Sequence, residues 1–282
     1  MIRMILDGKR INKIILDEVR NEVKDLSVKL KLEVIQVGDN AAGCVYLSQI
    51  EKMCSYVGYD FDYLRFDNDV TTDILLEVID RLNNDDTVTG IMIQLPLANH
   101  IDKNRVINSI SPLKDVDGVT DINKGKLFNN MDCLSPCTAV GIMELLDRYN
   151  IFVKGKSVLI IGRSDIVGKP LSMMMLNNDA TVTVCHSNTD NLIKYTKDAD
   201  IIVTAVGISN FITSDMVNDG VIIVDVGIVK LEDGICGDVD YNNLIDKCAY
   251  ITPVPGGVGP MTIAMLARNI LKAGKMQNRN QY

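Results

Sequence analysis

The residues best suited to chemistry lie in the stretch KSVLIIGRSDIVGKP, residues 156–170. An apolar run ends at Gly162, and a helical pattern begins near Ile166. Gly162 permits a tight turn, Ser164 is small enough for the backbone to approach a pyrophosphate, and Gly168 lets a helix pack close to the strand. Because helix N-termini bind phosphate groups, the spacing predicts a dinucleotide site. A plain glycine turn between a strand and a helix is the alternative interpretation.

The residue types around this turn favour NADP over NAD. In NAD-specific sites a carboxylate near the end of the second strand binds the ribose hydroxyl groups. Here the second apolar run, Thr181–Cys185, is followed by His186 and Ser187, and the first carboxylate is Asp190. A guanidinium and a hydroxyl group suit a ribose phosphate, so Arg163 supports NADP. NAD is the alternative cofactor, and a solvated loop arginine is the alternative interpretation of Arg163.

Buried strands alternating with amphipathic helices are needed to position these residues. Seven short runs are mostly apolar at consecutive positions, which is typical of strands covered on both faces in parallel sheets. The segments between them have apolar residues at a helical period. This alternation predicts an α/β fold with two parallel sheets. The expected strands are Leu32–Val37, Phe61–Phe66, Gly90–Leu95, Ser157–Ile161, Thr181–Cys185, Ile201–Val206 and Val221–Val226, and the expected helices include Ile11–Leu30, Thr72–Leu82, Ala139–Tyr149 and Met261–Lys272.

Bulk composition limits the class of protein. The chain has 282 residues, a net charge of −8 and 47% apolar residues, which argues for about two globular domains and against a nucleic-acid surface. The start MIRMILDGKR lacks the apolar stretch of a signal peptide, and no apolar run approaches the roughly 20 residues of a membrane span. We therefore expect a cytoplasmic protein without nucleic-acid or membrane partners. Seven cysteines without a repeated spacing argue against disulfides and against a metal site.

Five motifs occur together in a fixed order along the chain. Because of them, the chain closely resembles the methylenetetrahydrofolate dehydrogenase/cyclohydrolase family over essentially its whole length. The last motif is eleven residues long and highly specific. The motifs are IQLPL at 93–97, KDVDG at 114–118, GRSDIVGKP at 162–170, CHSNT at 185–189 and TPVPGGVGPMT at 252–262.

The resemblance implies two domains with an active-site cleft between them. The folate-binding domain would comprise residues 1–139 and a returning C-terminal helix at 262–282, and a Rossmann-like NADP domain would comprise residues 140–261. It also implies a homodimer. The implied chemistry belongs to one-carbon metabolism, which feeds purine biosynthesis: hydride transfer from the bridging methylene of the folate gives methenyltetrahydrofolate, and hydrolysis then gives the formyl form.

The same resemblance assigns site residues. Tyr46 would stack along the folate, Gln94 would lie near the reacting centre, and Asp117 would hold the amino and ring nitrogens of the pterin. A turn aspartate before a glycine is the alternative interpretation of Asp117. Further folate contacts would come from Ile93, Leu95, Pro255, Gly256 and Gly257. The implied cofactor contacts are Gly162, Arg163, Ser164, Ile166, Val167, His186, Ser187, Val206, Gly207, Gly227, Ile228, Gly257 and Thr262.

One position departs from the family at the centre of this site. The family has a Tyr-x-x-x-Lys pattern, and its lysine manages proton transfer and water attack. Here Tyr46 is followed four residues later by Ile50, which shares its helical face. Lys52 lies roughly 200 degrees around a helix from Ile50 and cannot substitute. Two nearby departures are Ala98, where proline is usual, and Ala139-Val140, where a Pro-Lys pair is usual.

The two half-reactions depend differently on this lysine. Hydride transfer chiefly needs two rings stacked at short distance, whereas hydrolysis needs a general acid or base worth about 10²–10⁴-fold. The Ile50 side chain can pack against its neighbours, but it cannot donate or accept a proton and cannot polarise a water molecule. We therefore predict a dehydrogenase with weak or absent cyclohydrolase activity. A catalytically inactive paralogue that binds folate and NADP is the alternative.

Overall fold

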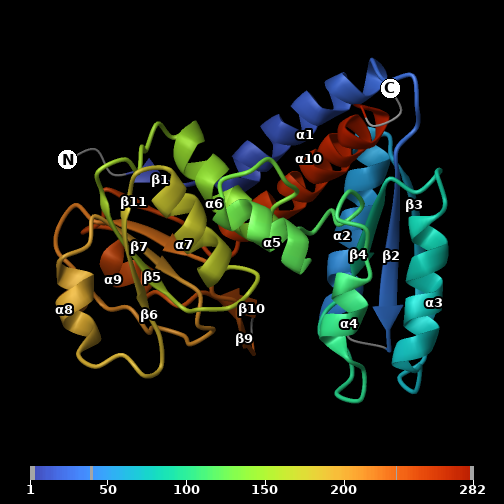
Figure 1. Ribbon diagram of the computed structural model, residues 1–282. Helices are drawn as coiled ribbons and strands as arrows, with labels where there is room; N and C mark the ends of the chain where they lie inside the picture. Colours follow the sequence, from blue (N-terminus) through green and yellow to red (C-terminus); the bar gives the residue numbers. More distant parts are fainter. Residues whose placement is uncertain (1–3, 39–40, 233, 280–282) are drawn as a thin grey trace. The chain divides into compact units, whose positions relative to one another are not determined.

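The computed structural model describes residues 4–38, 41–232 and 234–279 (Figure 1). The chain forms two compact units, each with its own sheet and core. Unit 1 comprises the chain up to Lys13 together with Thr138–Thr262, and unit 2 comprises Ile14–Cys137 with the chain from Ile263 onward. Each unit is therefore built from segments that are far apart in the sequence.

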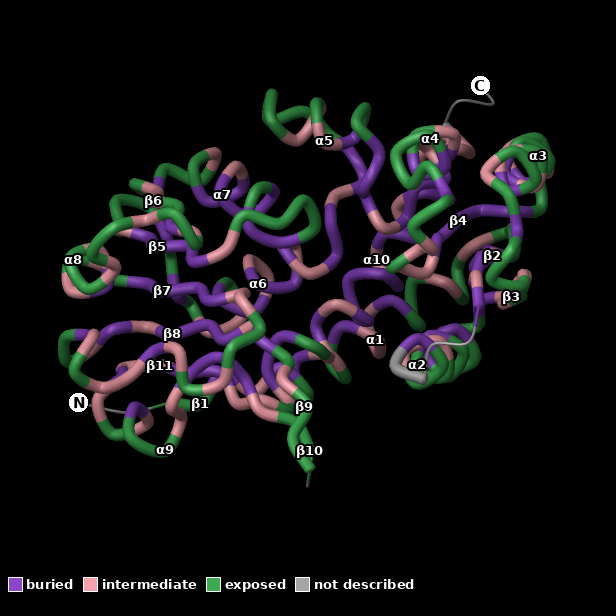
Figure 2. The backbone as a smooth tube through the Cα atoms, turned by 90° about the horizontal axis from the view of Figure 1, so that it is seen from below, coloured by how far each residue is buried: buried purple, intermediate pink, exposed green. Residues whose placement is uncertain are grey.

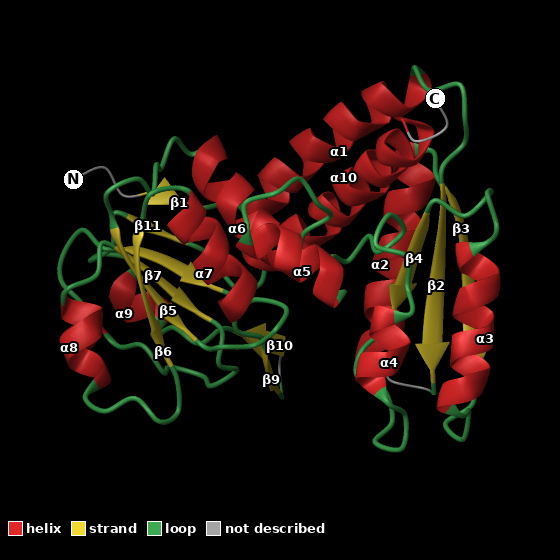
Figure 3. Ribbon diagram, viewed as in Figure 1, coloured by secondary structure: helices red, strands yellow, loops and turns green. Residues whose placement is uncertain are grey.

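Unit 1 is built on a parallel sheet of six described strands in the order β1-β11-β8-β7-β5-β6 (Figure 3). A short antiparallel pair, β9 and β10, lies outside this sheet. The strands are β1 (Met4–Ile5), β5 (Ser157–Ile161), β6 (Thr181–Cys185), β7 (Ile201–Thr204), β8 (Ile222–Asp225), β9 (Val229–Leu231), β10 (Gly234–Cys236) and β11 (Tyr250–Ile251). The helical elements are α6 (Cys137–Arg148), α7 (Gly168–Asn177), α8 (Leu192–Lys197), η1 (Ser214–Met216) and α9 (Tyr241–Leu244).

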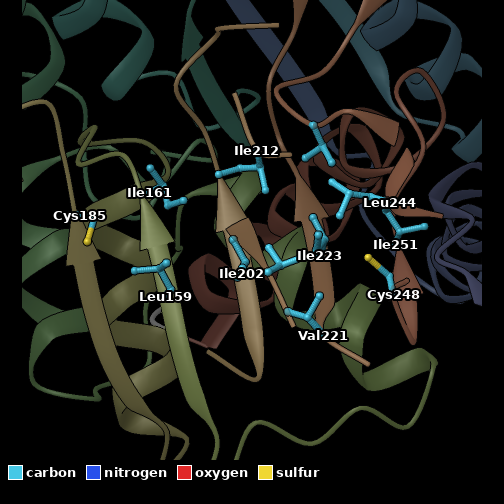
Figure 4. Close-up of a cluster of buried hydrophobic side chains, with 12 residues drawn as sticks. Leu159, Ile161, Cys185, Ile202, Ile212, Val221, Ile223, Leu244, Cys248 and Ile251 are labelled. Carbon is cyan, nitrogen blue, oxygen red and sulfur yellow. The ribbon is translucent and has the colours of Figure 1, made fainter. Parts of the chain in front are cut away.

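The core on one face of this sheet is a cluster of aliphatic side chains. Ile161, Ile202 and Ile223 come from three adjacent strands and are almost completely buried (Figure 4). Leu244 of α9 and Cys248 pack into the same cluster, and α7 packs on β5 and β6. Strands covered on both faces have no polar face, which explains their consecutive apolar residues.

Unit 2 contains a parallel sheet of three described strands in the order β3-β2-β4. Leu75 of α3 and Val106 of α4 share one core with Ile35 and Ile91 of the sheet. The helix α2 lies on the opposite face (Figure 2). The elements are β2 (Lys31–Val37), β3 (Asp60–Phe66), β4 (Gly90–Ile93), α2 (Ala41–Val57), α3 (Thr72–Asn83), α4 (Lys103–Asn108) and α5 (Asp121–Phe128), and two helices run from one unit into the other, α1 (Gly8–Lys24) and α10 (Val258–Arg279).

The predicted α/β class with two parallel sheets is confirmed. All seven expected strands are present, with ends that differ by at most two residues. The sequence prediction missed β1, β9, β10 and β11, because strands of two or three residues carry too few positions for a periodicity. The helix expected at Ile11–Leu30 instead begins at Gly8 and ends at Lys24.

The start of the chain groups differently in the two compact units than in the two predicted domains. The described chain up to Lys13 belongs to unit 1, not to a first domain of residues 1–139, because Met4 pairs with Tyr250 and the Lys9 N–H donates to the Gly256 carbonyl at 2.9 Å. The other boundaries, 139/140 and 261/262, lie within two residues of the observed ones. Residues 1–3 and 280–282 of the expected ranges lie outside the described residues. None of the described helices is both long enough and apolar enough to cross a membrane.

Candidate active site

The turn between β5 and α7 brings the helix very close to the end of the strand. Gly162 has φ +119°, and a Cβ atom on Gly168 would lie 2.1 Å from the Gly162 carbonyl oxygen. The Ser164 hydroxyl accepts the Val167 N–H at 3.2 Å, so this side chain shapes the loop, and α7 begins at Gly168 rather than near Ile166. No described side chain caps the N-terminus of α7. The Lys169 N–H donates to the Ser164 carbonyl at 3.0 Å and Pro170 has no N–H, so of the first three residues of α7 only Gly168 has an N–H group left for a phosphate.

The neighbouring turn after β6 carries the other predicted phosphate contact. Ile161 of β5 pairs with Cys185 of β6, so Arg163 and Ser187 follow adjacent strand ends, and both are exposed. His186 holds this turn, because its Nδ1 accepts the Asn188 N–H at 3.2 Å. A guanidinium and a hydroxyl group are thus presented at the edge of the sheet where a ribose phosphate would bind.

The remaining predicted cofactor residues follow the carboxyl ends of β7 and β8. These are Val206 and Gly207 after β7, and Gly227 and Ile228 after β8. Apart from Gly207 itself and its two chain neighbours, no described residue has an atom within 4 Å of a Cβ built on Gly207, which has φ +71°, and Ile228 is exposed. The strand order reverses between β5 and β7, where doubly wound sheets bind dinucleotides. The open space at Gly207, the Gly168 N–H at the start of α7 and the exposed Arg163 fit a dinucleotide phosphate.

The glycine loop of the last motif also lies in unit 1. The Gly256 carbonyl accepts the Lys9 N–H, and a Cβ on Gly8 would lie 1.8 Å from the Gly257 carbonyl oxygen. The start of α1 therefore holds this loop, and Pro255 is exposed beside it. Thr262 lies nearby in the chain, and its hydroxyl is 3.1 Å from the Thr138 hydroxyl.

In unit 2 the two carboxylates of the DVDG motif have different environments. Asp115 is completely buried and accepts hydrogen bonds from the Val119 and Thr120 N–H groups, the Thr120 hydroxyl and the Asn123 amide, at 2.7–3.0 Å. These contacts make it a structural carboxylate. Asp117 is half-buried, and burial together with the charge of Asp115 raises its pKa to about 6. Asp117 is therefore the carboxylate left to bind a ligand.

Tyr46 and Ile50 lie one turn apart on α2. Tyr46 is half-buried, and burial, followed by the negative charge of Asp117, raises its pKa well above its ordinary value. The Ile50 side chain is completely buried, whereas Lys52 is exposed. Besides burial, the groups that shift the pKa of Tyr46 are Asp117 and the Cys137 thiol, and those that shift the pKa of Asp117 are Asp115 and the same thiol. The site that the resemblance implies thus has an apolar side chain at the lysine position.

Gln94 contributes a buried polar atom at the end of β4. Its N–H donates to the Ile35 carbonyl at 2.9 Å, and its Nε2 donates to the Leu95 carbonyl at 3.3 Å. Its buried Oε1 has no hydrogen-bond partner among the described residues. Leaving such an oxygen unsatisfied costs about 1–3 kcal/mol, so it is ready to accept from a ligand. Ile93 is buried and Leu95 half-buried on either side of it.

Sequence reasoning missed several residues that hold these groups in place. Asn269 on α10 donates from its Nδ2 to the Val116 carbonyl at 2.8 Å and to the Ser135 carbonyl at 2.9 Å, which fixes the loop that carries Asp117. Asp225 and Asp238 form a similar network in unit 1. No pattern within the sequence marks Asn269, because its partners lie more than a hundred residues away. The described residues contain no group of three or more His, Cys, Asp or Glu side chains placed to hold a metal ion.

The fold and these residues define a class: a two-unit α/β protein with a dinucleotide-binding unit and a second unit that presents a half-buried carboxylate, a tyrosine and an unsatisfied amide. Two family models match most of the chain. Residues 6–117 match the catalytic domain of tetrahydrofolate dehydrogenase/cyclohydrolase, and residues 136–278 match the NAD(P)-binding domain of the same enzymes. The chain therefore belongs to the tetrahydrofolate dehydrogenase/cyclohydrolase family.

Individual relatives are similar over nearly their full lengths. The protein named bifunctional protein FolD from Hydrogenobaculum sp. (strain Y04AAS1) is 49% identical over 275 residues, which cover 97% of this chain and 99% of that protein. The solved structure of the bifunctional FolD enzyme from Campylobacter jejuni is 46% identical, with a TM-score of 0.95 over 97% of this chain and 99% of that one. The Trypanosoma brucei methylenetetrahydrofolate dehydrogenase-cyclohydrolase, solved with NADP and an inhibitor, is 32% identical, with a TM-score of 0.93 over 98% of this chain and 99% of that one.

Proposed function

We propose that this protein is an NADP-dependent methylenetetrahydrofolate dehydrogenase whose methenyltetrahydrofolate cyclohydrolase activity is weak or absent. One observation carries the proposal: the ligand-binding groups expected for the family are present, whereas position 50 holds a completely buried isoleucine. Family membership supports the dehydrogenase. The buried isoleucine supports the loss of hydrolysis.

The cofactor would bind along the carboxyl ends of the strands of unit 1. Arg163 and Ser187 bind the ribose phosphate, and the N-terminus of α7 binds the pyrophosphate. When bound, NADP supplies the hydride acceptor. NAD lacks the phosphate that Arg163 would bind, so it is the weaker ligand. The other proposed contacts are Gly162, Ser164, Ile166, Val167, His186, Val206, Gly207, Gly227, Ile228, Gly257 and Thr262.

The folate would bind to the polar groups of unit 2. The Asp117 carboxylate accepts two parallel hydrogen bonds from the amino and ring nitrogens of the pterin. Paired hydrogen bonds to a carboxylate are short and directional. Tyr46 stacks along the folate, and the free Gln94 Oε1 accepts a hydrogen bond near the reacting centre. The apolar and backbone contacts are proposed to come from Ile93, Leu95, Pro255, Gly256 and Gly257.

Hydrolysis needs a group that can take a proton from the attacking water. Ile50 has none, and the raised pKa of Tyr46 keeps its hydroxyl protonated at neutral pH, so it is a poor base. Asp117 is occupied by the pterin in this proposal. Without a general base the hydrolysis step loses about 10²–10⁴-fold in rate.

The assembly and location of the protein are part of the same proposal. The resemblance implies a homodimer formed through unit 1, which light scattering after size-exclusion chromatography would test. A location in the cytosol is likewise a prediction from the sequence.

The dehydrogenase is tested with methylenetetrahydrofolate that carries two deuterium atoms on its bridging carbon. The purified protein with NADP should transfer one deuterium to the nicotinamide, as measured by mass spectrometry of the reduced cofactor. Asp117→Asn is the matched variant, and it should transfer far less at the same folate concentration. Binding of both ligands without any deuterium transfer would favour the inactive paralogue instead.

A further inference from the structure

Two buried carboxylates lie beneath the loops that are proposed to bind the cofactor. Asp225 ends β8, and Asp238 follows β10; their side chains are 3% and 0% exposed. Burying a carboxylate is costly unless hydrogen bonds compensate it, so the donors around each carboxylate show what it holds. Neither residue belongs to the proposed set of ligand contacts.

Asp238 fixes the loop after β7 by hydrogen bonds. Its Oδ2 accepts from the Thr204 hydroxyl at 2.9 Å and from the Val206 N–H at 2.8 Å, and its Oδ1 accepts from the Ile208 N–H at 2.9 Å. The two N–H groups lie on either side of Gly207, where the space around a Cβ is open. The carboxylate therefore draws the flanking peptides inward and leaves Gly207 facing open space.

Asp225 extends the same network to two further loops. Its Oδ1 accepts the N–H groups of Gly227 at 2.9 Å and of Asp238 at 3.0 Å. Its own N–H donates to the Thr252 hydroxyl at 2.7 Å, at the start of the TPVPGG motif. The two carboxylates thus join the loops after β7 and β8, and the Asp225 main chain joins them to the residue that follows β11.

The packing leaves this network little freedom to move. A Cβ on Gly227 would lie 2.1 Å from Asp238 Oδ1, and a Cβ on Gly237 would lie 1.9 Å from Asp225 Oδ2. The carboxylates are therefore in direct contact with backbone. A substitution that changes the hydrogen bonds of either carboxylate must therefore shift the loops whose N–H groups it accepts.

The position of these loops indicates which half of the cofactor they contact. A dinucleotide lies across the point where the strand order reverses, with one half on each side. Arg163 and Ser187, the proposed ribose-phosphate contacts, follow β5 and β6 on one side of that point. The loops held by Asp238 and Asp225 follow β7 and β8 on the other side, where the nicotinamide half would lie.

We propose that Asp238 is a positioning residue for the nicotinamide half of the cofactor, acting through the loops at Val206–Ile208 and Gly227–Ile228. The inference rests on the proposed dinucleotide function of unit 1. It does not give Asp238 a contact with the ligand; the carboxylate acts through the backbone groups that it holds.

The test compares two probes on the full-length protein by titration calorimetry: NADP, and adenosine 2′,5′-bisphosphate, which lacks the nicotinamide half. In Asp238→Asn an amide NH₂ replaces one acceptor and faces backbone donors. We expect the Kd of NADP to rise about tenfold and that of adenosine 2′,5′-bisphosphate to change by less than about twofold. Arg163→Ala should weaken both probes, and Asp215→Asn, at an exposed carboxylate that bonds Thr213, should weaken neither.

The outcomes separate this inference from the function on which it rests. Equal weakening of both probes in Asp238→Asn, or no weakening of NADP, would overturn the inference while leaving the dinucleotide function in place. A wild-type protein that binds neither probe would overturn both. If Asp238→Asn does not fold, Thr204→Val removes one donor with little change in shape and should weaken NADP alone by about threefold; an unchanged NADP affinity in that variant would equally overturn the inference.

Discussion

At the scale of single residues, we propose that position 50 decides whether the protein has one activity or two. Ile50 is completely buried one helical turn from Tyr46, so a cation introduced there would be held near Tyr46 and Asp117. We predict that Ile50→Lys raises the rate of methenyltetrahydrofolate hydrolysis by about 10-fold or more, because it supplies a group for proton transfer. Decay of the methenyl compound measures this rate.

The control for that variant is Ile50→Leu, which keeps the apolar side chain. The lysine lowers stability because the position is buried, so thermal unfolding of both variants must be recorded. A folded Ile50→Lys protein that hydrolyses no faster than Ile50→Leu would show that the missing cation does not limit hydrolysis.

Asp117 gives a prediction about pH. Burial and the charge of Asp115 raise its pKa to about 6, and the carboxylate accepts hydrogen bonds from the pterin only when it is ionised. The ionised fraction grows as pH rises through this pKa. We therefore expect kcat/KM for methylenetetrahydrofolate to rise between about pH 5 and pH 7 and then level off.

Steady-state kinetics at saturating NADP measure this profile. Asp117→Asn should lower kcat/KM by about 100-fold, because an amide cannot accept both hydrogen bonds. It should also remove the rise near pH 6, because an amide does not titrate there. A wild-type profile that is flat over the same range would contradict the role of this carboxylate.

At the scale of elements, the turn between β5 and α7 depends on a close approach. A Cβ on Gly168 would lie 2.1 Å from the Gly162 carbonyl oxygen, so Gly168→Ala must push the helix away from the strand end. We predict that this substitution weakens NADP binding by about tenfold or more, because it displaces the start of α7, which is proposed to bind the pyrophosphate. Calorimetric titration with NADP measures the change.

Gly125→Ala is the matched control, since Gly125 lies within α5 and its Cβ would meet no described atom within 4 Å apart from its chain neighbours and the backbone of its own helix. Alanine is the better helix former, so this control should stabilise the protein by up to about 1 kcal/mol and leave NADP binding unchanged. NADP affinity that is the same in Gly168→Ala and wild type would contradict the account of this turn.

The sequence predicted the elements that carry a repeated pattern and missed those that depend on a distant partner. Buried strands such as β5 and β7 have consecutive apolar residues, and the glycine spacing marked the turn after β5. The edge strand β1 and its neighbour β11 are each two residues long, so only their pairing reveals them. Asn269 and Asp238 were missed for the same reason: their functions depend on backbone groups far away in the sequence.

At the scale of the whole molecule, each unit has its own core, and α10 completes that of unit 2. Leu266 and Ile270 are fully buried, and the Tyr59 hydroxyl donates to the Ala267 carbonyl at 2.9 Å. We predict that deleting residues 263–282 unfolds unit 2 but leaves unit 1 able to bind NADP, because unit 1 ends at Thr262. Hydrogen exchange should lose protection in β2 and β4 and keep it in β5 and β7. Protection of β2 in the truncated chain would contradict this division.

The central claim is that the protein carries out hydride transfer without efficient hydrolysis. It is tested most directly by incubating wild-type protein with methylenetetrahydrofolate and NADP and separating the folates by chromatography as reduced cofactor forms. We predict about one methenyltetrahydrofolate for each reduced cofactor, with formyltetrahydrofolate appearing no faster than in buffer. Formyltetrahydrofolate that forms as fast as the reduced cofactor, with no methenyl accumulation, would contradict the account.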